Sequence, residues 1–308
     1  MKAIGVDIGG TGVKGSIVTL SGEVIKTCKV VTNVSNGREG VLSSLFQVID
    51  QLITDEVVGI GVGTAGRVNV QTGEVVFATS NLPGWQGVNL INEVNKRYDL
   101  PCEVENDANA ALVGELWQGA AKDSSYFSVT MLTLGTGVGG ANSLNGNIIQ
   151  GGHCQSGEWG HMVFVPNGRL CNCGMKGCLE QYLSGTALVK VANEITGATF
   201  RHGEEIFQAY REGSKLVAPV VETYIDHLAL AIYNVSVSLD PDAVIIGGGV
   251  IDSKEVWWDL LVEKLANYHV ILTVAPALLG NKAGMLGAAK LLFDGVRKRS
   301  EPMCKEIR

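Results

Sequence analysis

The sequence predicts an α/β protein built from two related lobes. Short apolar strands alternate with segments of helical periodicity along the 308 residues, as expected of sheets covered by helices. A strand, a glycine-rich turn and a second strand occur twice, over residues 2–31 and 128–149, and such an internal repeat indicates two similar lobes. Hydrophobic residues make up 46% of the chain, enough for a sizeable core.

The first half of the chain supplies strands and helices in turn. Apolar and β-branched runs predict strands over residues 2–8, 11–20, 23–31, 57–62 and 102–105. Apolar residues spaced three or four apart predict helices over residues 38–53, 90–98 and 108–118.

The second half repeats this alternation with longer helices. Strands are expected over residues 128–134, over 141–149 with a turn at Asn145-Gly146, and over 243–246. Helical patterns cover residues 186–196, 204–211, 216–239 and 284–296.

Charge and hydropathy exclude several classes of protein. A net charge of −7 and a pI near 5.3 argue against a nucleic-acid-binding surface. No apolar run reaches the ~20 residues needed to span a bilayer, so no membrane partner is expected. The chain opens on a short strand pattern rather than a secretory signal. We therefore expect a cytoplasmic protein whose cysteines stay reduced.

Three clustered cysteines and one histidine predict a metal site. Cys171, Cys173 and Cys178 fall within eight residues, and His161 precedes them. Thiolate and imidazole are the ligands that Zn²⁺ prefers, and four of them close a structural site. Gly174 lies within this loop and, with Gly177, lets the chain fold back to one ion. The remaining cysteines and histidines lack ligand spacing and are expected to be ordinary residues: Cys28, Cys102, Cys154, Cys304, His153, His202, His227 and His269.

Glycine-rich turns follow apolar strands at three places, namely residues 7–11, 135–140 and 247–249. Such turns expose backbone N–H groups against which phosphate oxygens can sit. None has the Lys-Ser/Thr ending of a Walker A loop, and none opens a helix as a dinucleotide fingerprint does. Asp7, beside the first turn, can hold Mg²⁺ or can bond its own backbone as an ordinary turn aspartate.

Asn106 and Asp107 directly precede a helical pattern. Either side chain can cap that helix, but only one can do so. An aspartate left at the top of the strand can instead accept the proton of a hydroxyl during phosphoryl transfer. Both interpretations of Asp107 stay open at this point.

Several further side chains are candidates for binding a polyol. Asn81 can hydrogen-bond a sugar and Trp85 can cover its apolar face, although the spacing alone favours a turn with a half-buried tryptophan. Glu158 and Glu180 flank the metal loop and can bind hydroxyl groups. If zinc fixes one ring nitrogen of His161, the other carries a proton and needs an acceptor.

Taken together, these motifs resemble the ROK family of repressors, open reading frames and kinases. The resemblance runs from residue 4 to about residue 290. It rests on the motifs at residues 7–11, 106–109, 135–140, 158–161, 171–180 and 247–250. The resemblance implies the actin-like (ribonuclease H-like) ATPase fold, with two α/β lobes and a central cleft. The expected lobes are residues 1–117 with 290–308, and residues 118–289 with the zinc loop.

The resemblance also implies roles for individual residues. Asp107 would be the general base. A hexose would be held by Asn81, Asn106, Asp107, Glu158, His161 and Glu180. ATP and Mg²⁺ would contact Asp7, Gly9, Gly10, Thr11, Lys14, Gly135, Thr136, Gly137, Gly248 and Gly249. Structural zinc would be bound by His161, Cys171, Cys173 and Cys178. Members are commonly homodimers or larger homo-oligomers.

Two departures from the family pattern bear on these roles. Lys282 stands where members often carry aspartate, which affects the expected nucleotide contacts, and residues 63–66 replace a more usual proline-containing turn. The leading hypothesis is ATP-dependent phosphorylation of a hexose, glucose first, at the 6-hydroxyl. An N-acetylhexosamine kinase is the alternative, since the C2 pocket depends on loop shape. A sugar-responsive repressor is disfavoured, because the first strand begins at residue 2 and leaves no room for a helix-turn-helix.

Overall fold

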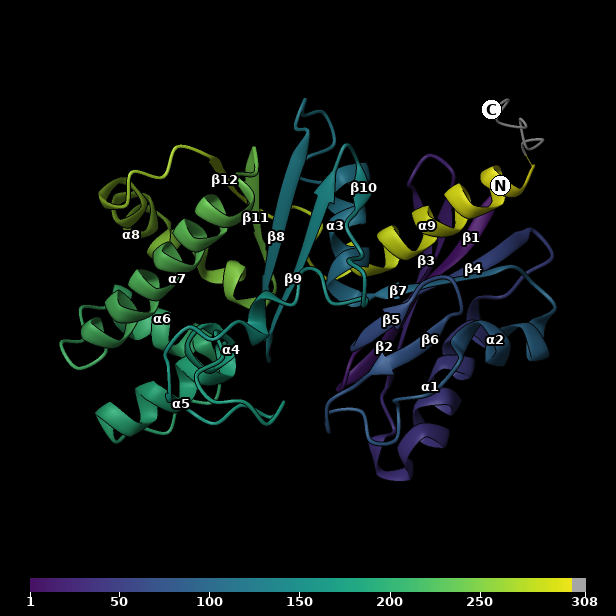
Figure 1. The fold of residues 1–308 in the computed structure, drawn as a ribbon. Coiled ribbons are helices and arrows are strands. Elements are labelled where there is room, and N and C mark those ends of the chain that lie inside the picture. Colours follow the sequence, from purple (N-terminus) through teal and green to yellow (C-terminus); the bar gives the residue numbers. More distant parts are fainter. Residues whose placement is uncertain (301–308) are drawn as a thin grey trace. The chain divides into compact units, whose positions relative to one another are not determined.

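The computed structural model describes residues 1–300 of the chain (Figure 1), and Cys304 lies outside this range. Contacts divide the chain into two compact units. The first contains residues 1–122, 152–154 and those from 281 onward, and the second contains residues 123–151 and 155–280. The lobe boundaries expected from the sequence stay a prediction, although the last helix already belongs to the first unit from its first residue.

The first unit is organised around a mixed five-stranded sheet in the order β3-β2-β1-β4-β7. The strands are β1 (Lys2–Ile8), β2 (Gly12–Thr19), β3 (Val24–Val31), β4 (Val57–Thr64) and β7 (Cys102–Asn106). The pairs β1–β2 and β2–β3 are antiparallel, whereas β1–β4 and β4–β7 are parallel. The carboxyl ends of β1, β4 and β7 therefore meet at one edge of the sheet.

Helices cover both faces of this sheet. One face packs on α1 (Gly37–Leu52), which follows the short 3₁₀ helix η1 (Val34–Asn36), and the core there also includes residues of α2 (Leu90–Tyr98). The other face packs on α3 (Asp107–Gln118) and α9 (Ala283–Ser300), which follows η4 (Gly280–Lys282). A small hairpin of β5 (Arg67–Asn69) and β6 (Glu74–Phe77) lies between β4 and α2 in the sequence.

Glycines allow the backbone of α9 to touch its neighbours directly. A Cβ atom at Gly5 of β1 would collide with the carbonyl group of Met285, and one at Gly61 of β4 would collide with that of Ala288. Gly287 makes an equally close approach to the carbonyl oxygen of Ala110 in α3. Because no side chain separates these backbones, the N-terminus of α9 is held at the sheet edge where the parallel strands end.

The second unit has a five-stranded sheet in the order β10-β9-β8-β11-β12. Its strands are β8 (Ser128–Leu134), β9 (Val138–Leu144), β10 (Asn147–Ile148), β11 (Ala243–Gly247) and β12 (Thr273–Pro276). Its helices are η2 (Trp159–His161), α4 (Glu180–Leu183), α5 (Gly185–Thr196), α6 (Gly203–Arg211), α7 (Ala218–Leu239), η3 (Gly249–Ser253) and α8 (Lys254–Asn267).

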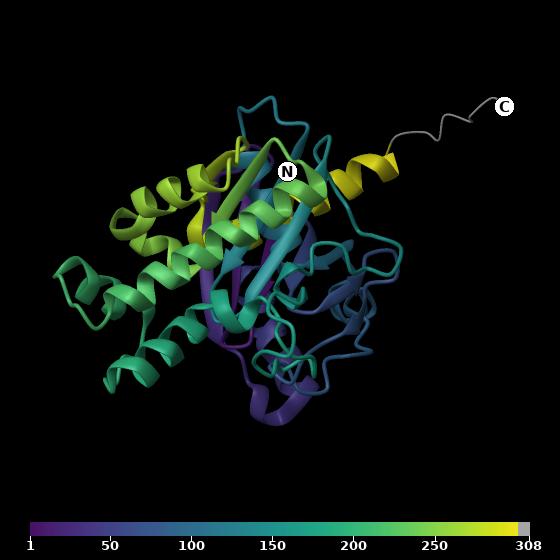
Figure 2. The ribbon, with the colours of Figure 1, turned by 60° about the vertical axis from the view of Figure 1, so that its left-hand side comes forward.

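The long helix α7 organises the core of this unit. It runs beside β11 and β8 in both views, and α8 packs against it (Figures 1 and 2). Leu228, Ile232 and Val235 of α7 are buried with Ile246 of β11 and Trp257 of α8. Although α7 is rich in apolar residues, none of the helices within residues 1–300 combines the length and the apolar content needed to cross a membrane.

We expect Gly61→Ala to destabilise the first unit by about 2–3 kcal/mol, because the added methyl group overpacks a backbone contact. Differential scanning calorimetry should show a lower Tm. Gly152→Ala is the matched control, since nothing lies within 4 Å of a Cβ at that position. Equal Tm values for the two variants would contradict this account of the α9 contact.

Candidate functional site

The carboxyl edge of the first sheet gathers polar side chains from three strands. Asp7 of β1 pairs with Gly63 of β4, and Asn106, the last residue of β7, pairs with Thr64. A Cβ at Gly284 near the start of α9 would lie 3.1 Å from Cγ of Asp7. The edge is therefore closed on one side by the N-terminus of a helix, a favourable setting for anions.

Asn106, and not Asp107, supplies the side-chain cap of α3. Its Oδ1 accepts hydrogen bonds from the backbone N–H groups of Ala108 at 2.9 Å and Asn109 at 3.1 Å. Its Nδ2 donates to Oδ1 of Asp107 and to the carbonyl oxygen of Gly66, each at 2.9 Å. Asp107 Oδ1 also accepts from the N–H of Ala108 at 2.9 Å. The Asp107 carboxyl group is thus fixed through one oxygen without being needed as the cap.

Burial raises the pKa of both aspartates at this edge. Burial raises the pKa of Asp107 above its ordinary value, although hydrogen bonds from Ala108 and Asn106 act against the rise. The pKa of Asp7 is raised to about 6, first by burial and then by the charge of Asp107, while Lys14 lowers it. A pair of carboxyl groups in which the charge of one raises the pKa of the other is suited to a divalent cation, and carboxylate oxygen is the ligand that Mg²⁺ prefers.

The first glycine turn is closed by its own backbone. The N–H of Gly9 donates to the carbonyl oxygen of Gly12 at 3.0 Å, and Thr32 Oγ1 donates to that of Gly9 at 2.6 Å. A Cβ at Gly10 would lie 3.5 Å from the carbonyl oxygen of Asn81. The exposed residue Asn81 therefore lies beside the turn, as does the exposed Thr11.

Trp85 has a structural role, and its suggested contact with a sugar face is wrong. The side chain is fully buried in the core of the first unit. Its Nε1 donates to Thr64 Oγ1 at 2.9 Å, which ties the loop around Asn81 to the end of β4. A buried indole bonded in this way has no face left for a ligand.

In the second unit, the four predicted metal-ligating side chains converge. One ligand atom from each of His161, Cys171, Cys173 and Cys178 lies within 4.8 Å of all the others. The two sulfurs of Cys173 and Cys178 are 3.7 Å apart, and Cys171 Sγ is 3.8 Å from His161 Nδ1. Tetrahedral zinc with Zn–S bonds of about 2.3 Å places its sulfurs about 3.8 Å apart. The donor set and its spacing therefore fit Zn²⁺.

The metal loop folds back through two glycines with positive φ, as expected. Gly174 has φ of 91° and Gly177 has φ of 83°. A Cβ at Gly177 would collide with the carbonyl oxygen of Val165. The N–H of Cys171 donates to the carbonyl oxygen of Met175 at 2.8 Å, which closes the turn between the first two ligands and the third.

Glu158 lies beside His161 because the two residues are three positions apart in one tight turn. Both belong to the turn around η2, and Glu158 Oε2 lies 3.8 Å from His161 Nε2. Because Nδ1 faces Cys171, Nε2 is the ring nitrogen left to a hydrogen-bond partner. Gly160 lets this turn pack on β9, since a Cβ there would collide with the carbonyl oxygen of Val138.

Glu180 links the metal loop to the second glycine turn. Its Oε2 accepts the backbone N–H of Val138 at 3.1 Å, and its Oε1 lies 3.8 Å from Cys171 Sγ. Gly137 makes this possible, because a Cβ there would occupy the position of the Glu180 carboxyl group. Gly137 thus makes room for Glu180, and its expected contact with nucleotide stays a prediction.

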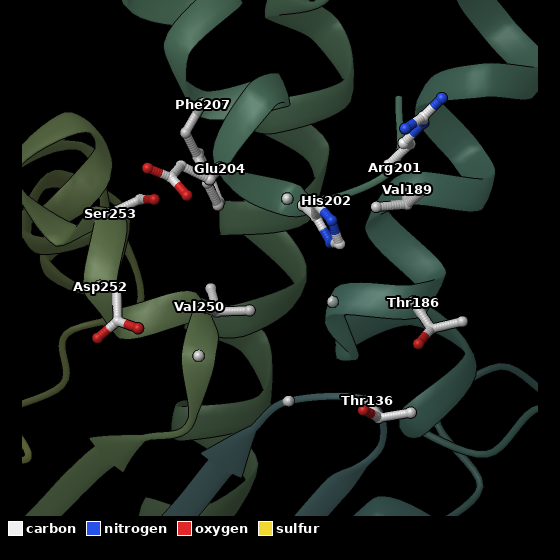
Figure 3. A pocket seen from close by; sticks show the side chains of 14 residues that line it. Thr136, Thr186, Val189, Arg201, His202, Glu204, Phe207, Val250, Asp252 and Ser253 are labelled. Atoms are coloured by element: carbon white, nitrogen blue, oxygen red, sulfur yellow. The ribbon is translucent and has the colours of Figure 1, made fainter. Parts of the chain in front are cut away.

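A cavity of about 550 Å³ lies in the second unit (Figure 3). Three residues that were predicted to contact nucleotide line this cavity: Gly135, Thr136 and Gly249. Residues of α5, of α6 and of the segment before it, and of η3 complete the wall: Gly185, Thr186, Val189, Arg201, His202, Gly203, Glu204, Phe207, Val250, Asp252 and Ser253. Figure 3 shows His202, Thr186 and Val250 around the open space.

Most of the residues that line this cavity were not predicted from the sequence. His202 has no ligand-type spacing and was expected to be an ordinary residue, yet it lines the cavity just before α6. The helical pattern of residues 204–211 predicts α6 but does not indicate that its first turn faces a cavity. Gly248, predicted to contact nucleotide, has φ of 84° and packs its backbone against Leu134.

Comparison with known proteins identifies the family. The ROK family profile matches residues 3–294. The chain belongs to the ROK family. A glucokinase of Thermotoga maritima is 33% identical over 96% of this chain and 98% of its own. An N-acetyl-D-glucosamine kinase of Escherichia coli is 30% identical over 93% of this chain and 98% of its own. The structure of a ROK family glucokinase from Streptomyces griseus with glucose and AMPPNP has a TM-score of 0.86 and 32% identity, covering 96% of this chain and all of its own.

The family and fold predicted from the sequence are both confirmed. The structural neighbours are ROK sugar kinases, which have the two-lobed actin-like ATPase fold. The α/β class predicted from the alternating strands and helices agrees with the two sheets and their covering helices.

Asp7 predicts a pH-dependent stability of the ligand-free protein. Its pKa of about 6 lies above the ordinary 3.8, so its stabilising contribution is present below pH 4 and is lost as the pH rises through 6. We expect Asp7→Asn to be more stable than the wild type at pH 7.5, by about 1–3 kcal/mol, and to keep only about half of this advantage at pH 5, which lies midway between the two pKa values. Urea denaturation at both pH values measures the effect. Asp259→Asn, on an exposed position of α8, should show no such difference, and an Asp7→Asn advantage that is absent at both pH values would contradict the assignment.

The metal cluster predicts that Cys173→Ser loses most of its zinc and has a lower Tm, because three donors hold a structural ion far less well than four. Metal analysis after gel filtration checks the zinc content. Cys28→Ser, in β3 and outside the cluster, is the control and should keep its zinc. Normal zinc content in Cys173→Ser would refute the ligand assignment.

Proposed function

We propose that this chain is an ATP-dependent kinase that phosphorylates the 6-hydroxyl of a hexose, with glucose as its main substrate. The proposal rests on one observation, namely that Asn106 and Asp107 have different roles at the start of α3. Asn106 caps α3 and also donates to Asp107, which leaves the Asp107 carboxylate available as a base. The glucose and AMPPNP bound by the Streptomyces griseus relative agree with this pair of substrates.

In the proposed reaction, Asp107 accepts the proton of the sugar hydroxyl as its oxygen attacks the terminal phosphorus. Burial raises the pKa of Asp107, which strengthens the carboxylate as a proton acceptor. The hydrogen bond from Asn106 Nδ2 holds Oδ1 at 2.9 Å and so orients the second oxygen. Orientation of this kind is the main contribution of a protein to phosphoryl transfer, which needs little covalent chemistry.

The nucleotide is proposed to use the glycine turns and the second-unit cavity. Asp7 would hold Mg²⁺, which neutralises charge on the phosphates when bound. Gly9, Gly10, Thr11 and Lys14 would face the phosphates from the first turn. Thr136 lies at the cavity with Gly135 and Gly249, and we assign this cavity to the nucleoside because its wall combines apolar and polar side chains. Gly137 and Gly248 would act there through the shape of the backbone.

Polar side chains are proposed to bind the sugar. Asn81 and Asn106 would bind hydroxyl groups in the first unit. Glu158, Glu180 and the Nε2–H of His161 would do so in the second. Zn²⁺ would fix the ring of His161 through Nδ1 and so present Nε2 as a donor.

An N-acetylhexosamine kinase is the second candidate. The 30% identical Escherichia coli protein is named for N-acetyl-D-glucosamine, and the two sugar classes differ only around C2. A coupled ADP-release assay with glucose, mannose, N-acetylglucosamine, N-acetylmannosamine, fructose and allose distinguishes the candidates. Assembly as a homodimer or larger homo-oligomer, and a cytoplasmic location, stay predictions.

We expect Asp107→Asn to lower kcat about a thousandfold while glucose binding changes little, because the amide keeps the size of the carboxyl group but accepts no proton. Steady-state kinetics and calorimetric titration with glucose measure the two quantities. Asp99→Asn at the exposed C-cap of α2 is the control and should retain full activity. Near-normal turnover in Asp107→Asn, or no turnover of any hexose by the wild type, would overturn the proposal.

A further inference from the structure

Two lysines face each other on the edge of the first sheet beside the glycine turn. Lys14 of β2 and Lys29 of β3 are register partners in an antiparallel pair, so their side chains project from the same face. Like charges placed directly opposite destabilise a strand pair. Within residues 1–300, the ion pairs include neither lysine. On its other side Lys14 has Asp7 of β1 as its register partner, so Lys29, on the edge strand, is the lysine of this pair that is suited to an anionic ligand.

The same face of the sheet carries the N-terminus of α9. Lys14 Nζ donates to Asn281 Oδ1 at 2.8 Å, and Ser16, two residues further along β2, reaches the sulfur of Met285 in α9. Since Lys29 projects with Lys14, it faces this side as well. Asp7 projects from this face too, because it is the register partner of Lys14 in the antiparallel β1–β2 pair.

The absence of a side chain at Gly12 directs Lys29 toward the glycine turn. A Cβ at Gly12 would lie 3.0 Å from Cε and 4.0 Å from Cγ of Lys29, so the lysine stem lies over Gly12. Gly12 closes the turn by accepting the N–H of Gly9. The ammonium group, one bond beyond Cε, is thereby carried to the edge of the turn.

We propose that Lys29 is a second cationic contact for the terminal phosphates of the triphosphate donor, opposite Lys14. The inference rests on the proposed function, because it places those phosphates at the turn of residues 9–12. Lys14 is held by Asn281, whereas the exposed Lys29 lies with its stem over Gly12, so Lys29 can follow the phosphate chain. Its role is in binding the donor and not in the transfer step.

Lys29→Ala tests this inference. We expect KM for ATP to rise on the order of tenfold, as for loss of a hydrogen bond to a charged group, with kcat and KM for glucose within about twofold. Lys26→Ala is the matched control, because Lys26 lies on the same strand but donates to the carbonyl oxygen of Gln51 in α1 at 2.7 Å. An equal change in both variants would indicate a general charge effect and would overturn the proposal.

Gly12→Ala provides an independent test that keeps every charge. The new methyl group would displace the stem of Lys29, so KM for ATP should again rise, and the double variant should be no worse than Lys29→Ala alone. Additive effects would show that Lys29 does not act through its position over Gly12.

Calorimetric titration with AMPPNP and with inorganic tripolyphosphate separates this inference from the proposed function. Weaker binding of both by Lys29→Ala supports the phosphate contact, even if the wild type phosphorylates none of the hexoses tested. Unchanged binding of both overturns it, even in an active glucokinase.

Discussion

The direct contact between the backbone of α9 and strands β1 and β4 is the constraint on which the first unit depends. Gly5, Gly61 and Gly287 lie at the points where two backbones touch, and a side chain at any of them would collide with a carbonyl group. The contact brings the start of α9 to the carboxyl end of the parallel strands, where Asn281 meets Lys14 and Gly284 meets Asp7. A helix one side-chain layer further away would leave the aspartate open to water, and its raised pKa depends on burial.

The Asn106-Asp107 pair shows how adjacent polar residues take different roles at a helix start. The asparagine amide has both acceptor and donor atoms, so it can cap the helix through Oδ1 and still donate through Nδ2. A carboxylate in its place would cap equally well but would repel Asp107. Glu105 extends the network, since its Oε1 accepts from the N–H of Asn106 and from Asn109 Nδ2. The strand end and the first helical turn are thereby joined by side-chain hydrogen bonds.

Features that depend on local sequence could be predicted, and features that depend on tertiary packing could not. The convergence of Cys171, Cys173, Cys178 and His161 follows from ligand spacing and two turn glycines. The choice between Asn106 and Asp107 as cap depends on side-chain orientation, which spacing leaves open. Trp85 could be placed only by knowing that its loop folds onto β4, and Phe207 of the cavity wall only by knowing which helices surround β11.

Helix α8 and the short strands β5, β6 and β12 were not assigned from the sequence, for different reasons. In α8, Trp257, Leu261 and Leu265 recur every four residues and are all buried, a pattern that indicates a helix. The short strands β5, β6 and β12 have three or four residues each, too few for alternation to be recognised. Gly137 makes room for a carboxylate 43 positions later, a contact that no local pattern indicates.

Glu180 gives the metal loop an influence beyond its own fold. One carboxyl oxygen accepts the N–H of Val138, while the other lies 3.8 Å from the thiol of Cys171, one of the predicted metal ligands. Chelation would free that thiol to move and would withdraw the acceptor from the β8–β9 turn as well. Removal of the predicted metal by EDTA would thus loosen the β8–β9 turn before any loss of secondary structure became visible.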